Sequence, residues 1–111
     1  MQSLADAPTI ELDRFELVLL KRPAHGPVIS EHEIDRLQEL HVAHLQALTI
    51  AGAIRVCGPF DEQRGQTLRG MGIYQTGSLE RTRELASSDP AVMAGRIEVD
   101  VMYFYCPKGS L

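Results

Sequence analysis

The sequence contains no tryptophan, only two cysteines and no long apolar run. Cys57 and Cys106 cannot form the disulfide framework of a small secreted domain, and neither lies in a CxxC pair. No apolar segment approaches the roughly 20 residues that span a bilayer, so we expect no membrane helix. The first residues lack a basic segment followed by an apolar one, which argues against a secretory signal. These absences predict a reduced, cytoplasmic protein.

Positive charge is also scarce, because 11 Lys and Arg residues stand against 15 Asp and Glu residues, for a net charge of −4. Nucleic-acid partners usually require a basic surface, so we expect none here. A hydrophobic fraction of 44% and a charged fraction of 23% are ordinary for a globular protein and exclude intrinsic disorder. The 111 residues suffice for one core. We place that single domain at residues 15–106, after a loose arm at residues 1–14 and before a tail at residues 107–111.

Six segments show the periodicity of a strand or a helix. Strands are predicted at residues 15–22, 53–60, 68–76 and 96–106, and helices between Ser30 and Gly52 and from Ser78 to about Ser88. Ser30 and Glu33 form a capping box at the start of the first helix, and residues 89–95 are expected to be a compact turn. The resulting order, β-α-β-β-α-β, is that of the ferredoxin-like α+β fold.

Two helices cover only one face of a four-stranded sheet. In the last strand Ile97, Val99, Val101, Tyr103 and Tyr105 alternate onto one face. We expect the face that the helices leave open to carry much of the valine, isoleucine and tyrosine content. An apolar face of this size needs a cover, and a second copy of the chain supplies one. The sequence therefore predicts a homodimer that packs through its open sheet faces.

His41 and His44 lie within the apolar stripe of the long helix, each about 30° from its centre at 100° per residue. A buried imidazole without a hydrogen-bond partner costs about 1–3 kcal/mol. One interpretation is that both histidines are hydrogen-bonded residues of the interior or of an interface. The other is that one of them lines a cavity beneath the helix and acts as a general acid or base, since histidine titrates near neutral pH.

Histidines at positions i and i+3 of a helix can also converge on a metal ion. No third ligand lies at short spacing from His41 and His44, so the pattern does not favour a zinc site. The sequence also lacks a glycine-rich phosphate loop, a G-x-S-x-G segment and an HExxH segment. We therefore predict no metal site.

Asp89 is the candidate partner for His41. A residue before proline avoids helical backbone angles, so Asp89 is expected in a turn, and turn formation alone explains an Asp-Pro pair. The functional interpretation is that its carboxylate accepts a hydrogen bond from His41 and fixes the tautomer of the ring. Gly58 and Pro59 end the second strand in a rigid turn, and Asp61 follows as a second candidate carboxylate.

Three segments of the chain together resemble the YCII-related (YciI-like) family. They are the helix segment from His41 to Gly52, the Gly58-Pro59 pair, and residues 85–95 around Asp89. The resemblance covers about residues 15–105 and implies a dimeric α/β barrel of two ferredoxin-like protomers. It also implies an active-site pair at His41 and Asp89, no cofactor, and chemistry on chlorinated hydroxyquinols with loss of chloride.

Two classes of function remain open. The first is a small cofactor-independent enzyme, a lyase or isomerase acting on a ring-hydroxylated or ketonic molecule, with His41 as general acid or base and Asp89 as its orienting group. Its substrate-binding residues are predicted to be His44, Gly58, Pro59 and Asp61. The alternative is a non-catalytic small-ligand-binding or accessory protein of the same fold, in which His41 only forms a hydrogen bond in the pocket.

Overall fold

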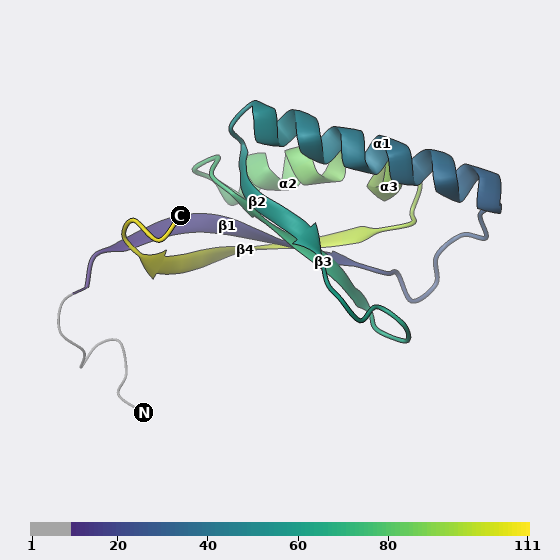
Figure 1. Cartoon of the computed structure of the whole chain (residues 1–111), viewed down its shortest axis with the longest axis horizontal. Helices are drawn as coiled ribbons and strands as arrows, with labels where there is room; N and C mark the ends of the chain where they lie inside the picture. Colours follow the sequence, from purple (N-terminus) through teal and green to yellow (C-terminus); the bar gives the residue numbers. More distant parts are fainter. Residues whose placement is uncertain (1–9) are drawn as a thin grey trace.

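The computed structural model describes residues 10–111 as a four-stranded antiparallel sheet with three helices on one of its faces (Figure 1). In chain order the elements are β1 (Leu12–Lys21), α1 (Glu31–Ile50), β2 (Ile54–Pro59), β3 (Leu68–Tyr74), α2 (Leu79–Ser87), α3 (Pro90–Met93) and β4 (Glu98–Pro107). The strands lie in the order β2-β3-β1-β4, and each neighbouring pair is antiparallel. This arrangement confirms the predicted ferredoxin-like α+β fold.

The first and last strands extend beyond the predicted domain bounds at residues 15 and 106. β1 begins at Leu12 and pairs along its whole length with β4, which extends to Pro107. Beyond that pair the backbone N–H of Lys108 donates to the carbonyl of Glu11 over 2.9 Å. Backbone pairing continues past the apolar alternation, so residues 12–14 and 107 belong to the sheet and not to the predicted arm and tail. Residues 1–9 of the predicted arm lie outside the described residues.

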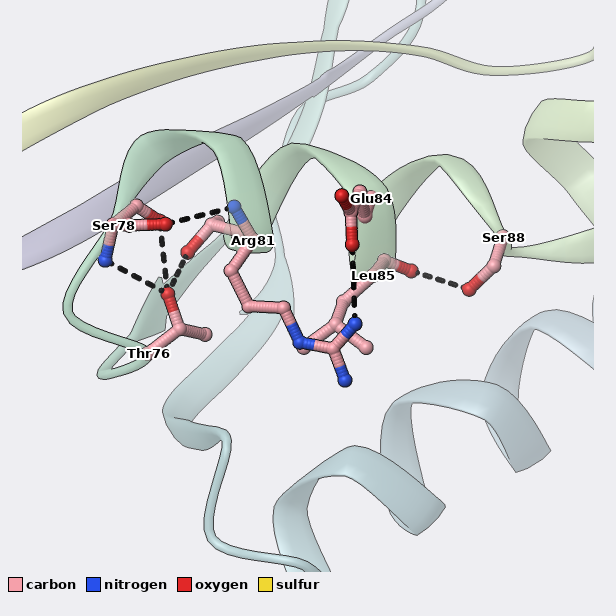
Figure 2. Close-up of polar contacts among 7 residues, drawn as sticks. Thr76, Ser78, Arg81, Glu84, Leu85 and Ser88 are labelled. Carbon is pink, nitrogen blue, oxygen red and sulfur yellow. Dashed lines mark hydrogen bonds and ion pairs between the residues drawn. The ribbon is translucent and has the colours of Figure 1, made fainter.

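Side-chain caps begin both long helices where the sequence predicts them. The hydroxyl of Ser30 accepts from the N–H of Glu33 at the start of α1, which is one of the two hydrogen bonds of the expected capping box. The Glu33 carboxylate instead accepts from Arg36. Figure 2 shows the start of α2, where Ser78 Oγ accepts from the N–H of Arg81 over 2.9 Å. Thr76 supports this cap, because its hydroxyl accepts from the backbone N–H of Ser78 over 3.2 Å.

The main core lies between the helices and the sheet. Its buried members are Val18, Ile54, Tyr74 and Ala86, and leucines of α1 and α2 together with Val99 and Val101 of β4 pack against them. The valines of β4 therefore face the helices, and the expectation that they would lie on the open face is wrong. Alternation shows that a strand has two faces, but it does not show which of them the helices cover.

A second apolar cluster forms the opposite face of the sheet. Phe15, Ile73 and Cys106 are its buried members, and Leu17 and Met71 pack against them. The next positions of β4 on this face, Met102 and Phe104, are each 39% exposed. The open face is thus apolar, as predicted, but apart from Ile73 these residues are Phe, Leu, Met and Cys, where the sequence suggested valine and tyrosine.

A buried carboxylate joins β1 to the start of α2. Glu16 is 1% exposed, and its Oε1 accepts from the hydroxyls of Thr76 and Thr82, each over 2.8 Å, and from the N–H of Thr76 over 2.7 Å. These three donors compensate for the loss of water around the carboxylate. Nothing in the sequence pattern pointed to Glu16.

Candidate active site

A cavity of about 1790 Å³ lies between α1 and the sheet. Ile34, Gln38, His41 and Leu45 of α1 line it, because their spacing places them on one side of that helix. The sheet contributes residues of β1, β2 and β3. The β1–α1 loop at residues 22–29, the β2–β3 loop and residues 95–97 before β4 complete the wall. The cavity is large enough for a small ring compound.

His41 lines this cavity and is hydrogen-bonded to Asp89, which does not line it. Nδ1 of His41 donates to Oδ2 of Asp89, and the exposed fractions of the two residues are 8% and 2%. The other carboxylate oxygen, Oδ1, accepts from the backbone N–H of Ala91 over 2.9 Å. Because both oxygens have partners, the carboxylate is held in one orientation and in turn orients the imidazole. The contact expected from the sequence is present, and the catalytic role given to it stays a proposal.

A one-turn helix holds Asp89 in place. The sequence predicts a turn at residues 89–95, but the structure has α3 there, with Asp89 as its N-cap and Pro90 as its first residue. Proline fits this position because its fixed φ suits a helix and its missing N–H would have had no intrahelical partner. Gly95 follows α3 at a φ of +77°, a conformation that favours glycine. Since α3 packs against α1, the cap carboxylate reaches His41.

Opposing effects set the charge of Asp89. Burial raises the pKa of this carboxyl, but the hydrogen bonds from His41 and from the N–H of Ala91 outweigh it and hold the pKa below its ordinary value of 3.8. Nearby His44 lowers it further. Asp89 is therefore a carboxylate at neutral pH and binds His41 in the form that carries hydrogen on Nδ1. In that form Nε2 is the ring atom left to face the cavity.

The other predicted binding residues fall into two groups. Gly58 and Pro59 line the same cavity as His41. His44 and Asp61 are not part of its wall. The half-buried His44 donates from Nε2 to the carbonyl of Leu85 over 2.9 Å and so links α1 to α2. His44 is therefore a half-buried, hydrogen-bonded residue, as one interpretation had it. His41 lines a cavity, as the other required, and its role as general acid or base stays a proposal.

Tyr74 is a cavity residue that the sequence analysis missed. It is 2% exposed, it lines the cavity, and its hydroxyl makes no hydrogen bond to the residues that the structure describes. Burial raises the pKa of this phenol, and Cys57 and Asp89 nearby raise it further, so it remains a hydrogen-bond donor. Its ring lies against Gly72, where a Cβ would stand 3.1 Å from Cε1. A glycine two positions before a strand tyrosine was the available sequence signal.

Two other kinds of site were sought in the described part of the chain. Residues 10–111 contain no group of three or more His, Cys, Asp or Glu side chains placed to hold a metal ion. Within the same range, no helix combines the length and the hydropathy that crossing a membrane requires.

Comparison with known proteins finds a matching family model and a solved structure of similar fold. The model of the YCII-related domain matches residues 16–104. A similar solved structure is 5-chloro-2-hydroxyhydroquinone dehydrochlorinase from Burkholderia phenoliruptrix AC1100 in complex with 2,5-dihydroxybenzoquinone. The likeness has a TM-score of 0.57 at 19% identity and covers 79% of this chain and 90% of the other. At this identity the likeness shows the fold alone. No curated protein sequence matches the chain.

Proposed function

The chain belongs to the YCII-related domain family, and from this premise we propose that it is a small cofactor-independent enzyme that moves protons on a ring-hydroxylated or ketonic molecule. One observation carries the proposal, namely a cavity-lining imidazole whose Nδ1 is held by a buried, ionised carboxylate. The dehydrochlorinase of the same fold, whose complex holds a dihydroxybenzoquinone, supports this substrate class.

His41 is the general acid and base of the proposed reaction. With hydrogen on Nδ1 and a carboxylate behind it, the ring presents Nε2 to the cavity and accepts a proton from a hydroxyl, or from a carbon next to a carbonyl. Asp89 stabilises the imidazolium that forms and preserves the tautomer. Tyr74 lines the same cavity, and its hydroxyl donates to the substrate oxygen on which negative charge develops.

Dehydrochlorination follows from these roles without an oxidant. His41 removes a proton from a ring hydroxyl and returns a proton to the ring carbon that bears chlorine, which converts the enol into its keto tautomer. Chloride then leaves with the carbon–chlorine electron pair while a second hydroxyl loses its proton, and the ring becomes a quinone. The net change is loss of one proton and one chloride. On a substrate without a leaving group the same two proton transfers give an isomerisation.

We further propose a homodimer packed through the open sheet faces. The support is the apolar surface of Leu17, Met71, Met102 and Phe104 on the side of the sheet away from the helices. Exposed apolar surface of this kind is typical of an interface. We place the protein in the cytoplasm, where its free cysteines stay reduced.

Chloride release tests the enzymatic proposal. The probe is 5-chloro-2-hydroxyhydroquinone under nitrogen, and we expect the protein to accelerate release at least about 100-fold over buffer, a typical contribution of general acid–base catalysis. His41→Ala removes this acceleration. His32→Ala, an exposed histidine at the start of α1 that does not line the cavity, retains it.

Deuterium exchange tests proton transfer on substrates without chlorine. We expect the protein to speed the incorporation of solvent deuterium into the ring of hydroxyhydroquinone, as followed by proton NMR. An unaccelerated rate in both assays, or equal rates for the wild type and His41→Ala, would contradict the enzymatic proposal. Ligand binding without turnover would then favour the alternative of a non-catalytic binding protein.

A further inference from the structure

We infer that the cavity takes an anionic substrate, a ring that carries a carboxylate or a phenolate, and that Arg22, Arg69 and Arg96 hold its charge. This inference rests on the proposed function and narrows its substrate class. It begins from the composition of the cavity wall, where no residue is Asp or Glu. The chain as a whole carries 15 such residues and a net charge of −4. The wall therefore has the opposite sign to the rest of the molecule.

The strand register brings the three arginines to the same end of the sheet. Lys21 at the end of β1 pairs with Leu68 of β3 and with Glu98 of β4. Arg22 follows β1 directly, and its backbone N–H donates to the carbonyl of Thr67 over 2.8 Å. Arg69 is the second residue of β3, and Arg96 lies two residues before β4. The three residues thus lie close together at the same end of three neighbouring strands, and all three are among the residues that line the cavity.

None of these arginines has an anionic partner within residues 10–111. The ion pairs found there involve Lys21, Arg36, His41, Arg81 and Lys108. Arginines without counter-charges give the cavity wall a positive potential, which favours an anionic ligand. Guanidinium groups also match the two oxygens of a carboxylate in geometry.

Arg69 is held ready for such an anion. Its Nη1 donates to the backbone carbonyl of Gln63 over 2.8 Å and lies 3.4 Å from the side-chain oxygen of the same residue. Gln63 donates back from Nε2 to the carbonyls of Arg69, over 2.9 Å, and of Phe60, over 3.0 Å. These contacts fix the guanidinium without neutralising it. A ligand then meets a positioned donor and avoids part of the cost of ordering a flexible side chain.

A matched pair of probes tests the inference. 2,5-Dihydroxybenzoate and 2,5-dihydroxybenzamide share a ring and two hydroxyls and differ in charge. By titration calorimetry we expect the benzoate to bind at least about tenfold more tightly than the benzamide, because charge-assisted hydrogen bonds exceed neutral ones. The difference narrows as potassium chloride is added, since salt screens exposed charge. Equal affinities for the two probes would overturn the inference.

Single substitutions test which arginines bind the carboxylate of the benzoate. Arg96→Gln and Arg69→Gln each weaken benzoate binding about tenfold and leave benzamide binding unchanged. Arg96→Lys restores part of the affinity. Arg83→Gln removes an exposed arginine of α2 that does not line the cavity and serves as the matched control. Arg69 also holds Gln63, so Arg96→Gln is the decisive variant if Arg69→Gln lowers the melting temperature. Benzoate binding that none of the cavity arginines affects would overturn the inference.

The binding measurement needs no turnover, so the two proposals fail separately. Benzoate binding that depends on arginine, without deuterium exchange or chloride release in any assay, would overturn the enzymatic proposal and support the anion site. Proton transfer that runs equally fast on charged and neutral rings would support the enzyme and overturn the anion site.

Discussion

Nδ1 of His41 donates to Oδ2 of Asp89 across 48 residues of sequence, and the second oxygen of the same carboxylate accepts from the N–H of Ala91. A single side chain therefore caps α3 and orients the imidazole of α1. Rotation of the carboxylate would break both bonds, so the cap contributes to the rigidity of the site.

Replacing Asp89 by Asn tests the orienting role. Asparagine keeps the cap, because its side-chain oxygen still accepts from Ala91, but its amide group no longer enforces hydrogen on Nδ1 of His41. We expect kcat to fall by about two to four orders of magnitude, as it does when the carboxylate of a His-Asp pair is amidated. Circular dichroism should remain that of the wild type. A variant that retains most of the activity would limit Asp89 to capping α3.

The stability of the protein should depend on Asp89 in the acid range. The pKa of this carboxyl is lower in the folded chain than its ordinary value of 3.8, so its contribution is complete above that pH and is lost as the pH falls through the lowered pKa. The difference in unfolding free energy between wild type and Asp89→Asn should thus be constant at about pH 5–7 and should narrow below about pH 4. Urea titrations across this range provide the measurement. A difference that does not change with pH would contradict the assignment.

Tyr74→Phe separates catalysis from folding. The hydroxyl has no partner among the described residues, so its removal should change the unfolding free energy by less than about 1 kcal/mol. A donor to developing negative charge is worth more in the transition state, and we expect kcat to fall about 10- to 100-fold. A large loss of stability at unchanged kcat would show that the hydroxyl serves the core.

Thr82→Val tests the buried carboxylate of β1. Valine keeps the shape of threonine but removes one of the three donors to Glu16 Oε1. We expect a destabilisation of about 1–3 kcal/mol, the usual cost of a buried acceptor that loses a partner. The control is Thr49→Val on the exposed side of α1, which should change stability by about 0.5 kcal/mol or less. Equal effects in urea unfolding would show that the hydrogen bond to Glu16 contributes little.

The open sheet face should hold two chains together. Light scattering of the wild type at micromolar concentration should give the mass of a dimer, since an interface of this kind buries about 2,000 Å² or more. Phe104→Glu places a charge on that face and should give monomers. Met93→Glu alters an apolar residue of α3, 76% exposed, and should leave the dimer intact. A monomeric wild type would refute the predicted assembly.

Several features of the protein follow from the sequence alone. The order of strands and helices, the caps at Ser30 and Ser78, and the place of His41 on the apolar side of its helix all follow from patterns within a few residues. Periodicity and capping act over one or two turns, so they are visible in any window of that length. For the same reason Asp89 could be recognised as a residue at the start of a turn, although the turn is a short helix.

Contacts between distant segments decided the rest. The pairing of β1 with β4 set which face of each strand meets the helices, and it placed Val99 and Val101 under them. Packing distinguished His41, which lines the cavity, from His44 one turn later, which bonds to Leu85. The sheet register brought three cavity-lining arginines that are distant in sequence to the same end of the sheet. These outcomes depend on register and on the direction in which elements pack, and local sequence patterns do not encode either.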